Sequence, residues 1–292
     1  MSMIEGTYAG FIVELHPPGI AVTTFTHPER LNAMSAGTRR DLIEVLGLAQ
    51  LDDRVRVIVF TATGRGFVAG VYNGAGDGAS EAPTLVPPIP DHPHVPIDLY
   101  GRLRLHGQEL PRAIRRLDKL TIAAVNGYAI QLGLSLVLAC DFAVAARSAQ
   151  LGSATLRMGW QPDEGGHWLL VEHLGVKGAL DFLMRKRMVD GDEAARLGLV
   201  TESVDDDALM ERAMELAGEL ADGPQVAMRL LKRAVYNAAR LTFDQAGDDI
   251  ASKTAISDFH QDALDGAPAF FERRPAAFNR WLTGERDADD HS

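Results

Sequence analysis

Residues 122–141 read IAAVNGYAIQLGLSLVLACD and lie inside a nearly continuous apolar run from Leu120 to Ala146. The run is long enough to cross a bilayer. Asn126-Gly127 is a turn signal, however, and Asp141 would place a charge at membrane depth, where it is costly. We therefore predict no membrane span but the buried core of an α/β protein, with a strand over 120–125, a turn, an apolar helix from about Gln131, and a strand over 141–146.

The flanking segments alternate strand and helix patterns. Residues 20–25 alternate as a strand, and Arg56 to Phe60 is a strongly β-prone run. Ser35 is a candidate N-cap for a helix over 36–51. This order predicts a largely parallel sheet. From about Asp205 the pattern predicts helices over 208–220, 225–241 and 243–257, so we expect a core domain over residues 1–204 and a helical region over residues 205–292.

The composition limits the classes of partner and compartment. With 29 Lys and Arg against 40 Asp and Glu, the formal net charge is −11, which argues against a nucleic acid as the main ligand. Cys140 is the only cysteine, so nothing points to an oxidising compartment. The first residues lack a signal-peptide pattern, and we expect a cytoplasmic protein. Asp91-His92-Pro93-His94 lacks a clear third ligand, so we predict no metal site.

Two segments share a pattern that is typical of an anion-binding turn. Arg56 to Val71 and Ile122 to Asp141 each predict a strand, a glycine-containing turn and a helix start. A helix start carries unpaired backbone N–H groups, and two of them aimed at one point make an oxyanion hole. The plainer interpretation is two ordinary strand-to-helix turns, and composition alone favours it. Ser135 lies outside a G-x-S-x-G pattern, so a serine-hydrolase elbow is not predicted.

Together these segments resemble the crotonase (enoyl-CoA hydratase/isomerase) superfamily, and the likeness covers nearly the whole chain. The resemblance implies an α/β fold built as a spiral of ββα units with a C-terminal helical trimerisation region. It implies a homotrimer or a dimer of trimers. It also implies an acyl-CoA thioester substrate, with coenzyme A as part of the substrate and no separate cofactor. The stretches that carry the resemblance are 27–35, 55–70, 123–127, 139–141, 194–200 and 266–274.

The resemblance also assigns residues to a site. The backbone N–H groups of Val71 and Leu132 would hold the oxygen of a thioester enolate. Leu132 stands where the family usually has glycine, so we expect its isobutyl group to narrow or re-aim the hole. The resemblance places Arg30 and Arg273 near the phosphates of coenzyme A. The competing interpretation is that each is an ordinary surface arginine with no ligand. The residues implied to contact substrate or coenzyme A are Arg30, Leu31, Ala33, Ala69, Val71, Tyr72, Asn73, Phe270 and Arg273.

The chain departs from the hydratase pattern at the two catalytic carboxylates. Hydratases of the family use two glutamates, and the matching positions here are Ser135 and Thr155, neither of which is a general base unaided. This argues against hydration by the two-glutamate route. Asp163 and Glu164 resemble the acidic stretch of the family's isomerases and are the predicted catalytic residues. The competing interpretation is that they charge a helix N-terminus.

Three functions remain open from the sequence. The first is an acyl-CoA enzyme of isomerase or hydratase type in which Asp163 or Glu164 moves a proton. The second is a hydrolase of C–C or thioester bonds that uses Glu164 and His167. The third is a non-catalytic acyl-CoA-binding homologue. The Gly- and Pro-rich loop over residues 74–94 is expected to influence acyl specificity.

Overall fold

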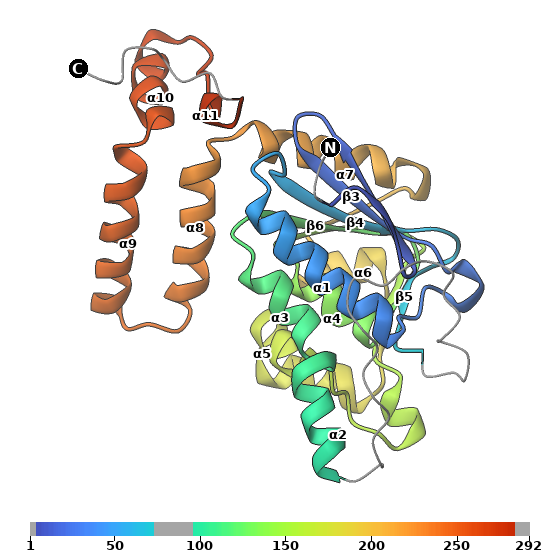
Figure 1. The fold of residues 1–292 in the computed structure, drawn as a ribbon. Helices are drawn as coiled ribbons and strands as arrows, with labels where there is room; N and C mark the ends of the chain where they lie inside the picture. Colours follow the sequence, from blue (N-terminus) through green and yellow to red (C-terminus); the bar gives the residue numbers. More distant parts are fainter. Residues whose placement is uncertain (1–3, 73–95, 284–292) are drawn as a thin grey trace.

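The computed structural model describes residues 4–72 and 96–283, and its core is a seven-stranded sheet. Figure 1 shows how the helices are arranged around it. The strand order is β1-β2-β3-β4-β6-β8-β11. Strands β3 to β11 of this order pair in parallel, and only β1 and β2 are antiparallel, which confirms the largely parallel sheet. The bounds are β1 (Gly6–Tyr8), β2 (Phe11–His16), β3 (Ile20–Phe25), β4 (Val57–Ala62), β6 (Leu120–Val125), β8 (Phe142–Ala146) and β11 (Glu202–Val204).

A second, four-stranded sheet has the order β10-β9-β7-β5, and the sequence analysis missed it. After β4 and after β6 the chain turns into another short strand rather than directly into a helix. The prediction of a helix start immediately after each turn is therefore wrong. Within the described residues, only the second segment continues into a helix, α4 (Leu132–Ala139), after β7. The strands are β5 (Gly66–Ala69), β7 (Tyr128–Ile130), β9 (Gln150–Gly152) and β10 (Met188–Asp190).

Helices pack on both sheets. Helix α7 (Leu209–Asp222) packs on β4 and β6, while the fully buried α4 packs on β5, β7 and α5. Ser35 caps α1 as predicted, because its Oγ accepts a hydrogen bond from the Thr38 N–H at 3.0 Å. The remaining helices of this part are α1 (Ala36–Leu51), α2 (Pro96–Arg102), a π-helical turn (Leu103–Gly107), α3 (Glu109–Arg116), α5 (Gly166–Met184) and α6 (Gly191–Leu197).

The C-terminal helices extend away from the core (Figure 1). Helices α8 (Gln225–Ala238) and α9 (Phe243–Asp258) form a hairpin, followed by α10 (Gln261–Glu272) and α11 (Arg280–Thr283). The three predicted C-terminal helices are confirmed, and α10 is an addition that contains Pro268. The trimerisation role of these helices stays a prediction. In residues 4–72 and 96–283 no helix combines the length and apolarity that a bilayer crossing needs.

Candidate active site

The site is built where β5 and β7 end side by side. These strands pair in parallel, with Ala69 opposite Ile130. The next residue of each strand, Gly70 or Gln131, has a positive φ, 82° and 54° respectively. The left-handed region is unusual for glutamine, so the backbone at Gln131 is held there by its surroundings. The backbone therefore turns at the same level of the sheet after each of the two strands.

The two predicted donors follow these turns at equivalent positions. Leu132 is the first residue of α4, so its N–H has no acceptor within the helix. Val71 forms a bridge with Met34, but that bridge uses the Met34 N–H, the Met34 carbonyl and the N–H of Tyr72. Within residues 4–72 and 96–283, neither the Val71 N–H nor the Leu132 N–H donates to a protein acceptor. Two backbone donors therefore remain unpaired at neighbouring strand ends.

The start of α4 is fixed by close packing on β5. A Cβ on Gly133 would lie 2.0 Å from the carbonyl oxygen of Val68, so only glycine fits there. The Leu132 side chain belongs to the hydrophobic core and is fully buried. The expectation that its isobutyl group narrows or re-aims the hole stays a prediction.

Gln131 links this turn to the predicted acids. Its Oε1 accepts hydrogen bonds from Ser153 Oγ at 2.7 Å and from Thr155 Oγ1 at 3.4 Å. Its Nε2 donates to Glu164 Oε2 at 2.8 Å. The amide thus presents its N–H to Glu164, and the two hydroxyls donate to its oxygen. The residue that sets the α4 turn therefore also positions a carboxyl group.

Glu164 is buried, with 4% of its surface exposed. Burial raises its pKa from 4.5 to about 8, the charge and hydrogen bond of Asp163 add to this rise, and the bond from Gln131 opposes it. Asp163 is half-buried, and its carbonyl oxygen accepts a hydrogen bond from Gln108 Nε2 at 3.1 Å. The structure thus brings Glu164, rather than Asp163, into contact with Gln131.

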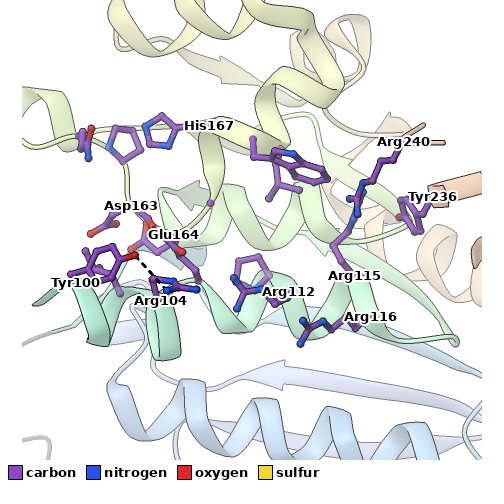
Figure 2. A pocket seen from close by; sticks show the side chains of 18 of the residues that line it. Tyr100, Arg104, Arg112, Arg115, Arg116, Asp163, Glu164, His167, Tyr236 and Arg240 are labelled. Carbon is purple, nitrogen blue, oxygen red and sulfur yellow. Dashed lines mark hydrogen bonds between the residues drawn. The ribbon is translucent and has the colours of Figure 1, made fainter. Parts of the chain in front are cut away.

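Both acids line a cavity of about 810 Å³ (Figure 2). Its walls come from α2, α3, the segment before α5, and α8 with the turn after it. His167 also lines this cavity from an exposed position on α5. The two positions that carry glutamate in hydratases differ: Ser135 is buried in α4, whereas Thr155 contacts Gln131.

The residues that sequence reasoning missed are Gln131 and Ser153. Gln131 stood out as a polar residue in an apolar run, which was the available signal. Its partners lie 22 and 33 positions later in the chain, and spacing in the sequence does not reveal such contacts.

Most of the predicted coenzyme A residues gather at the end of β5. The Ala69 N–H donates to the Leu31 carbonyl at 3.0 Å. The Arg30 guanidinium lies 4.5 Å from the centre of the Tyr72 ring, a cation–π contact. Ala33 is buried, and it directly precedes Met34, the residue that forms the bridge to Val71. These residues therefore form one surface beside the Val71 donor.

Phe270 and Arg273 lie elsewhere in the chain. Phe270 is 79% exposed on α10, and Arg273 ends that helix with a φ of 56°. Figure 1 shows α10 at the far end of the molecule from β5, so a single chain does not bring these two residues to Arg30. Asn73, the loop over 74–94 and the two histidines at 92 and 94 lie outside the described residues. The described ranges hold no cluster of three or more His, Cys, Asp or Glu suited to a metal ion.

Comparisons with known proteins agree on one family. Residues 16–82 and 95–280 match the family profile described as enoyl-CoA hydratase/isomerase. The chain is 30% identical over 270 residues to the 1,2-epoxyphenylacetyl-CoA isomerase of Escherichia coli K12, covering 92% of this chain and 98% of the relative. It is 29% identical over 260 residues to the crotonyl-CoA hydratase of Syntrophomonas wolfei, covering 89% and 94%.

A solved structure gives the same result for the fold. The crystal structure of the enoyl-CoA hydratase from Bacillus anthracis superposes with a TM-score of 0.81 at 25% identity, covering 92% of this chain and 98% of that one. The family profile spans well over half of the sequence, and the expected α/β crotonase fold is confirmed. The chain therefore belongs to the enoyl-CoA hydratase/isomerase family of the crotonase superfamily.

Proposed function

We propose that this protein is an acyl-CoA enzyme that shifts a double bond in the acyl group through a thioester enolate. The backbone N–H groups of Val71 and Leu132 hold the enolate oxygen, and Glu164 moves the proton. The observation that carries the proposal is the hydrogen bond from Gln131 to the buried Glu164, because Gln131 immediately precedes the Leu132 donor. The names of the relatives, an acyl-CoA isomerase and enoyl-CoA hydratases, support a thioester substrate.

The two unpaired N–H groups suit an oxygen that gains negative charge. They are fixed by parallel strands β5 and β7, so they need no rearrangement when the charge develops. Leu132 adds the positive end of the α4 dipole. Preorganised donors of this kind typically contribute about 3 kcal/mol each to transition-state stabilisation.

Glu164 has the pKa that a proton shuttle needs. As a carboxylate it takes a proton from one carbon of the enoyl group, and the electron pair moves into the thioester carbonyl. As a carboxylic acid it then returns the proton to a different carbon, and the carbonyl re-forms. A pKa of about 8 makes both forms accessible near neutral pH, and efficient general acid–base catalysis requires this match.

Hydration by two glutamates is not the proposed reaction. Ser135 and Thr155 occupy the positions that the resemblance assigns to those glutamates. The Thr155 hydroxyl lies 3.4 Å from the Gln131 amide oxygen and carries no charge at neutral pH. Neither of these two hydroxyl side chains replaces a carboxylate as the base that activates water.

A second candidate is hydrolysis with Glu164 and His167, because His167 lines the same cavity as Glu164. We place it second, since the exposed His167 has no hydrogen bond to Glu164 within the described part of the chain. A non-catalytic acyl-CoA binder is the third candidate. The homotrimer or dimer of trimers and the cytoplasmic location also remain predictions.

The test is a set of 2-enoyl- and 3-enoyl-CoA thioesters, followed by chromatography of the products. We expect interconversion of the double-bond isomers by the wild type, a large loss in Glu164→Gln, and retained turnover in Asp163→Asn and His167→Gln. Release of free coenzyme A or a cleaved acyl group that requires His167 would support the hydrolase. Binding without turnover by any variant would support the non-catalytic homologue.

A further inference from the structure

The cavity that contains Glu164 is rich in arginine, although the chain as a whole carries a net charge of −11. Such a concentration of guanidinium groups contrasts with the acidic protein around it and favours an anionic occupant. The acids that line the same cavity are Asp163 and Glu164. The arginines that line it are Arg104, Arg112, Arg115, Arg116, Arg233 and Arg240.

Most of these arginines form an ion pair with a carboxylate of the protein, which largely neutralises their charges. Arg115 is the most buried of the paired set, stacked 3.8 Å from the centre of the Tyr236 ring. Arg115 therefore forms part of the cavity wall and is not available to pair with an anionic ligand. The pairs are Arg112 and Arg116 with Glu109, Arg115 with Glu172, and Arg233 with Asp118.

Arg104 and Arg240 differ from this set. Arg104 contacts Tyr100, with the guanidinium 5.6 Å from the ring centre and Nη1 3.4 Å from the hydroxyl. Arg240 lies 4.9 Å from the centre of a Trp168 ring. Neither forms an ion pair with a carboxylate in residues 4–72 and 96–283. Both guanidinium groups are therefore available to an anion from outside the chain.

Arg104 lies at the same end of the cavity as the catalytic acid. Gln108, at the start of α3, donates a hydrogen bond to the carbonyl oxygen of Asp163, the neighbour of Glu164. Arg104 lies in the π-helical turn (Leu103–Gly107) that directly precedes Gln108. Figure 2 shows Arg104 next to Asp163 and Glu164, with Arg115 and Arg240 at the opposite end.

A series of contacts connects the predicted coenzyme A surface, the two backbone donors and the cavity. Arg30 and Tyr72 lie beside Val71, Gln131 connects the Leu132 turn to Glu164, and Gln108 connects the acidic segment to α3. Glu164 and Arg104 line the same cavity, so a thioester whose reacting carbons meet Glu164 can place its acyl tail in this cavity, within reach of Arg104. Arginine binds a carboxylate through two parallel hydrogen bonds.

We propose that the preferred substrate carries a carboxylate at the far end of its acyl group, and that Arg104 binds it. The proposal rests on the proposed function, because it uses the same orientation of the thioester. It adds the chemical class of the acyl group. An uncharged tail of the same length would leave the Arg104 guanidinium without an anionic partner in this cavity.

The test measures binding, so it does not depend on turnover. Saturated CoA thioesters are compared in pairs of equal length, one ending in a methyl group and one in a carboxylate, such as hexanoyl-CoA and adipoyl-CoA. A short series of lengths covers different reaches. Titration calorimetry gives the ratio of the two Kd values for wild type, Arg104→Gln and Arg104→Lys. Arg185→Gln is the matched control, since Arg185 is an exposed arginine at the end of α5.

We expect at least one carboxylate-ended thioester to bind about tenfold more tightly than its methyl-ended partner, because a charge-assisted hydrogen bond is worth this much. Arg104→Gln brings the ratio close to one, Arg104→Lys keeps part of it, and Arg185→Gln keeps the wild-type ratio. Because Arg104 is exposed, its replacement is expected to leave the fold unchanged, which circular dichroism verifies.

Equal binding within every pair, or a preference that survives Arg104→Gln, overturns this inference even if isomerisation is found. A preference that depends on Arg104 in a protein without isomerase activity overturns the proposed reaction and leaves the binding inference standing. Failure of every CoA thioester to bind overturns both.

Discussion

Gln131 Nε2 donates a hydrogen bond to Glu164 Oε2 at 2.8 Å, and this contact joins the two halves of the candidate active site. Gln131 forms the turn between β7 and α4, and the N–H that follows it belongs to Leu132. Glu164 lies in the segment before α5, on the wall of the cavity. One side chain therefore relates the position of the proposed proton-moving group to the proposed position of the enolate oxygen.

The pH dependence of turnover reports the ionisation of Glu164. Because the proposed mechanism uses Glu164 first as a base, we expect kcat/KM to rise with pH and to level off above about pH 8, its pKa in the folded protein. Asp163→Asn removes the negative charge that helps to raise this pKa, so the midpoint moves to lower pH. The measurement is the pH profile of kcat/KM. A midpoint unchanged in Asp163→Asn would contradict the assigned coupling.

Replacing Gln131 changes the same profile in the opposite direction. The Gln131 N–H stabilises the charged form of Glu164, so Gln131→Ala is expected to move the midpoint to higher pH. Turnover at neutral pH falls because less carboxylate is present. The check is again the pH profile, with Ser153→Ala as a comparison that keeps the Gln131 to Glu164 bond. Lower activity without any shift of the midpoint would assign Gln131 a merely structural role.

Glu164 also makes the stability of the protein depend on pH. Its pKa is about 8 in the folded protein and near the ordinary 4.5 in the unfolded chain. Between these values the folded state holds a proton that the unfolded state has released, so the free energy of unfolding falls as pH rises from about 4.5 to 8. Glu164→Gln lacks this loss and gains up to about 4 kcal/mol over the wild type by pH 8.

Denaturant unfolding at several pH values measures that difference. Below the ordinary pKa of glutamate the wild type and Glu164→Gln are expected to converge, because both side chains are then neutral in both states. Glu44→Gln, at an exposed position on α1, serves as the control and shows no such trend. A constant difference between Glu164→Gln and wild type at all pH values would show that Glu164 is not protonated in the folded state.

The start of α4 is sensitive to a single methyl group. Gly133→Ala places a Cβ 2.0 Å from the Val68 carbonyl oxygen, so the helix must move away from β5. We expect a loss of roughly 3 kcal/mol in the free energy of unfolding. We also expect turnover to fall in the fraction that stays folded, because the Leu132 N–H moves with the helix. Thermal unfolding and kcat measure the two effects.

Gly247→Ala is the matched control. Gly247 lies inside α9, and a Cβ there meets nothing within 4 Å. Alanine is the better helix former, so this variant is expected to be more stable by about 0.5–1 kcal/mol with unchanged turnover. Equal effects of the two substitutions would contradict the close packing of α4 on β5.

The sequence predicted secondary structure best where the pattern of buried apolar residues has the period of a strand or a helix. The strands over 20–25 and 120–125 and the helix over 36–51 have the predicted bounds, because alternation, an apolar run and the Ser35 cap are local signals. The four strands of the small sheet have three or four residues each, too few for a periodic pattern. Their existence depends on pairing between distant segments, so local patterns did not reveal it.

The same limit applies to the candidate site, because local patterns do not reveal contacts between distant segments. The resemblance named Val71, Leu132, Asp163 and Glu164, and the turn residues that place the first two lie side by side on paired strands. Neither the burial of the Leu132 side chain nor the contact between Gln131 and Glu164 follows from spacing. Both depend on how α4 packs on β5 and on the segment before α5. The choice of Glu164 over Asp163 therefore came from burial and contact alone.

The most direct test of Glu164 as the proton-moving group is exchange of substrate protons with solvent. An enoyl-CoA thioester is incubated in D₂O with wild type, Glu164→Gln, Asp163→Asn or His167→Gln, and deuterium in the acyl group is followed by NMR. We predict incorporation by the wild type, Asp163→Asn and His167→Gln, and a loss of at least about 100-fold in Glu164→Gln. Wild-type exchange in Glu164→Gln would contradict the account.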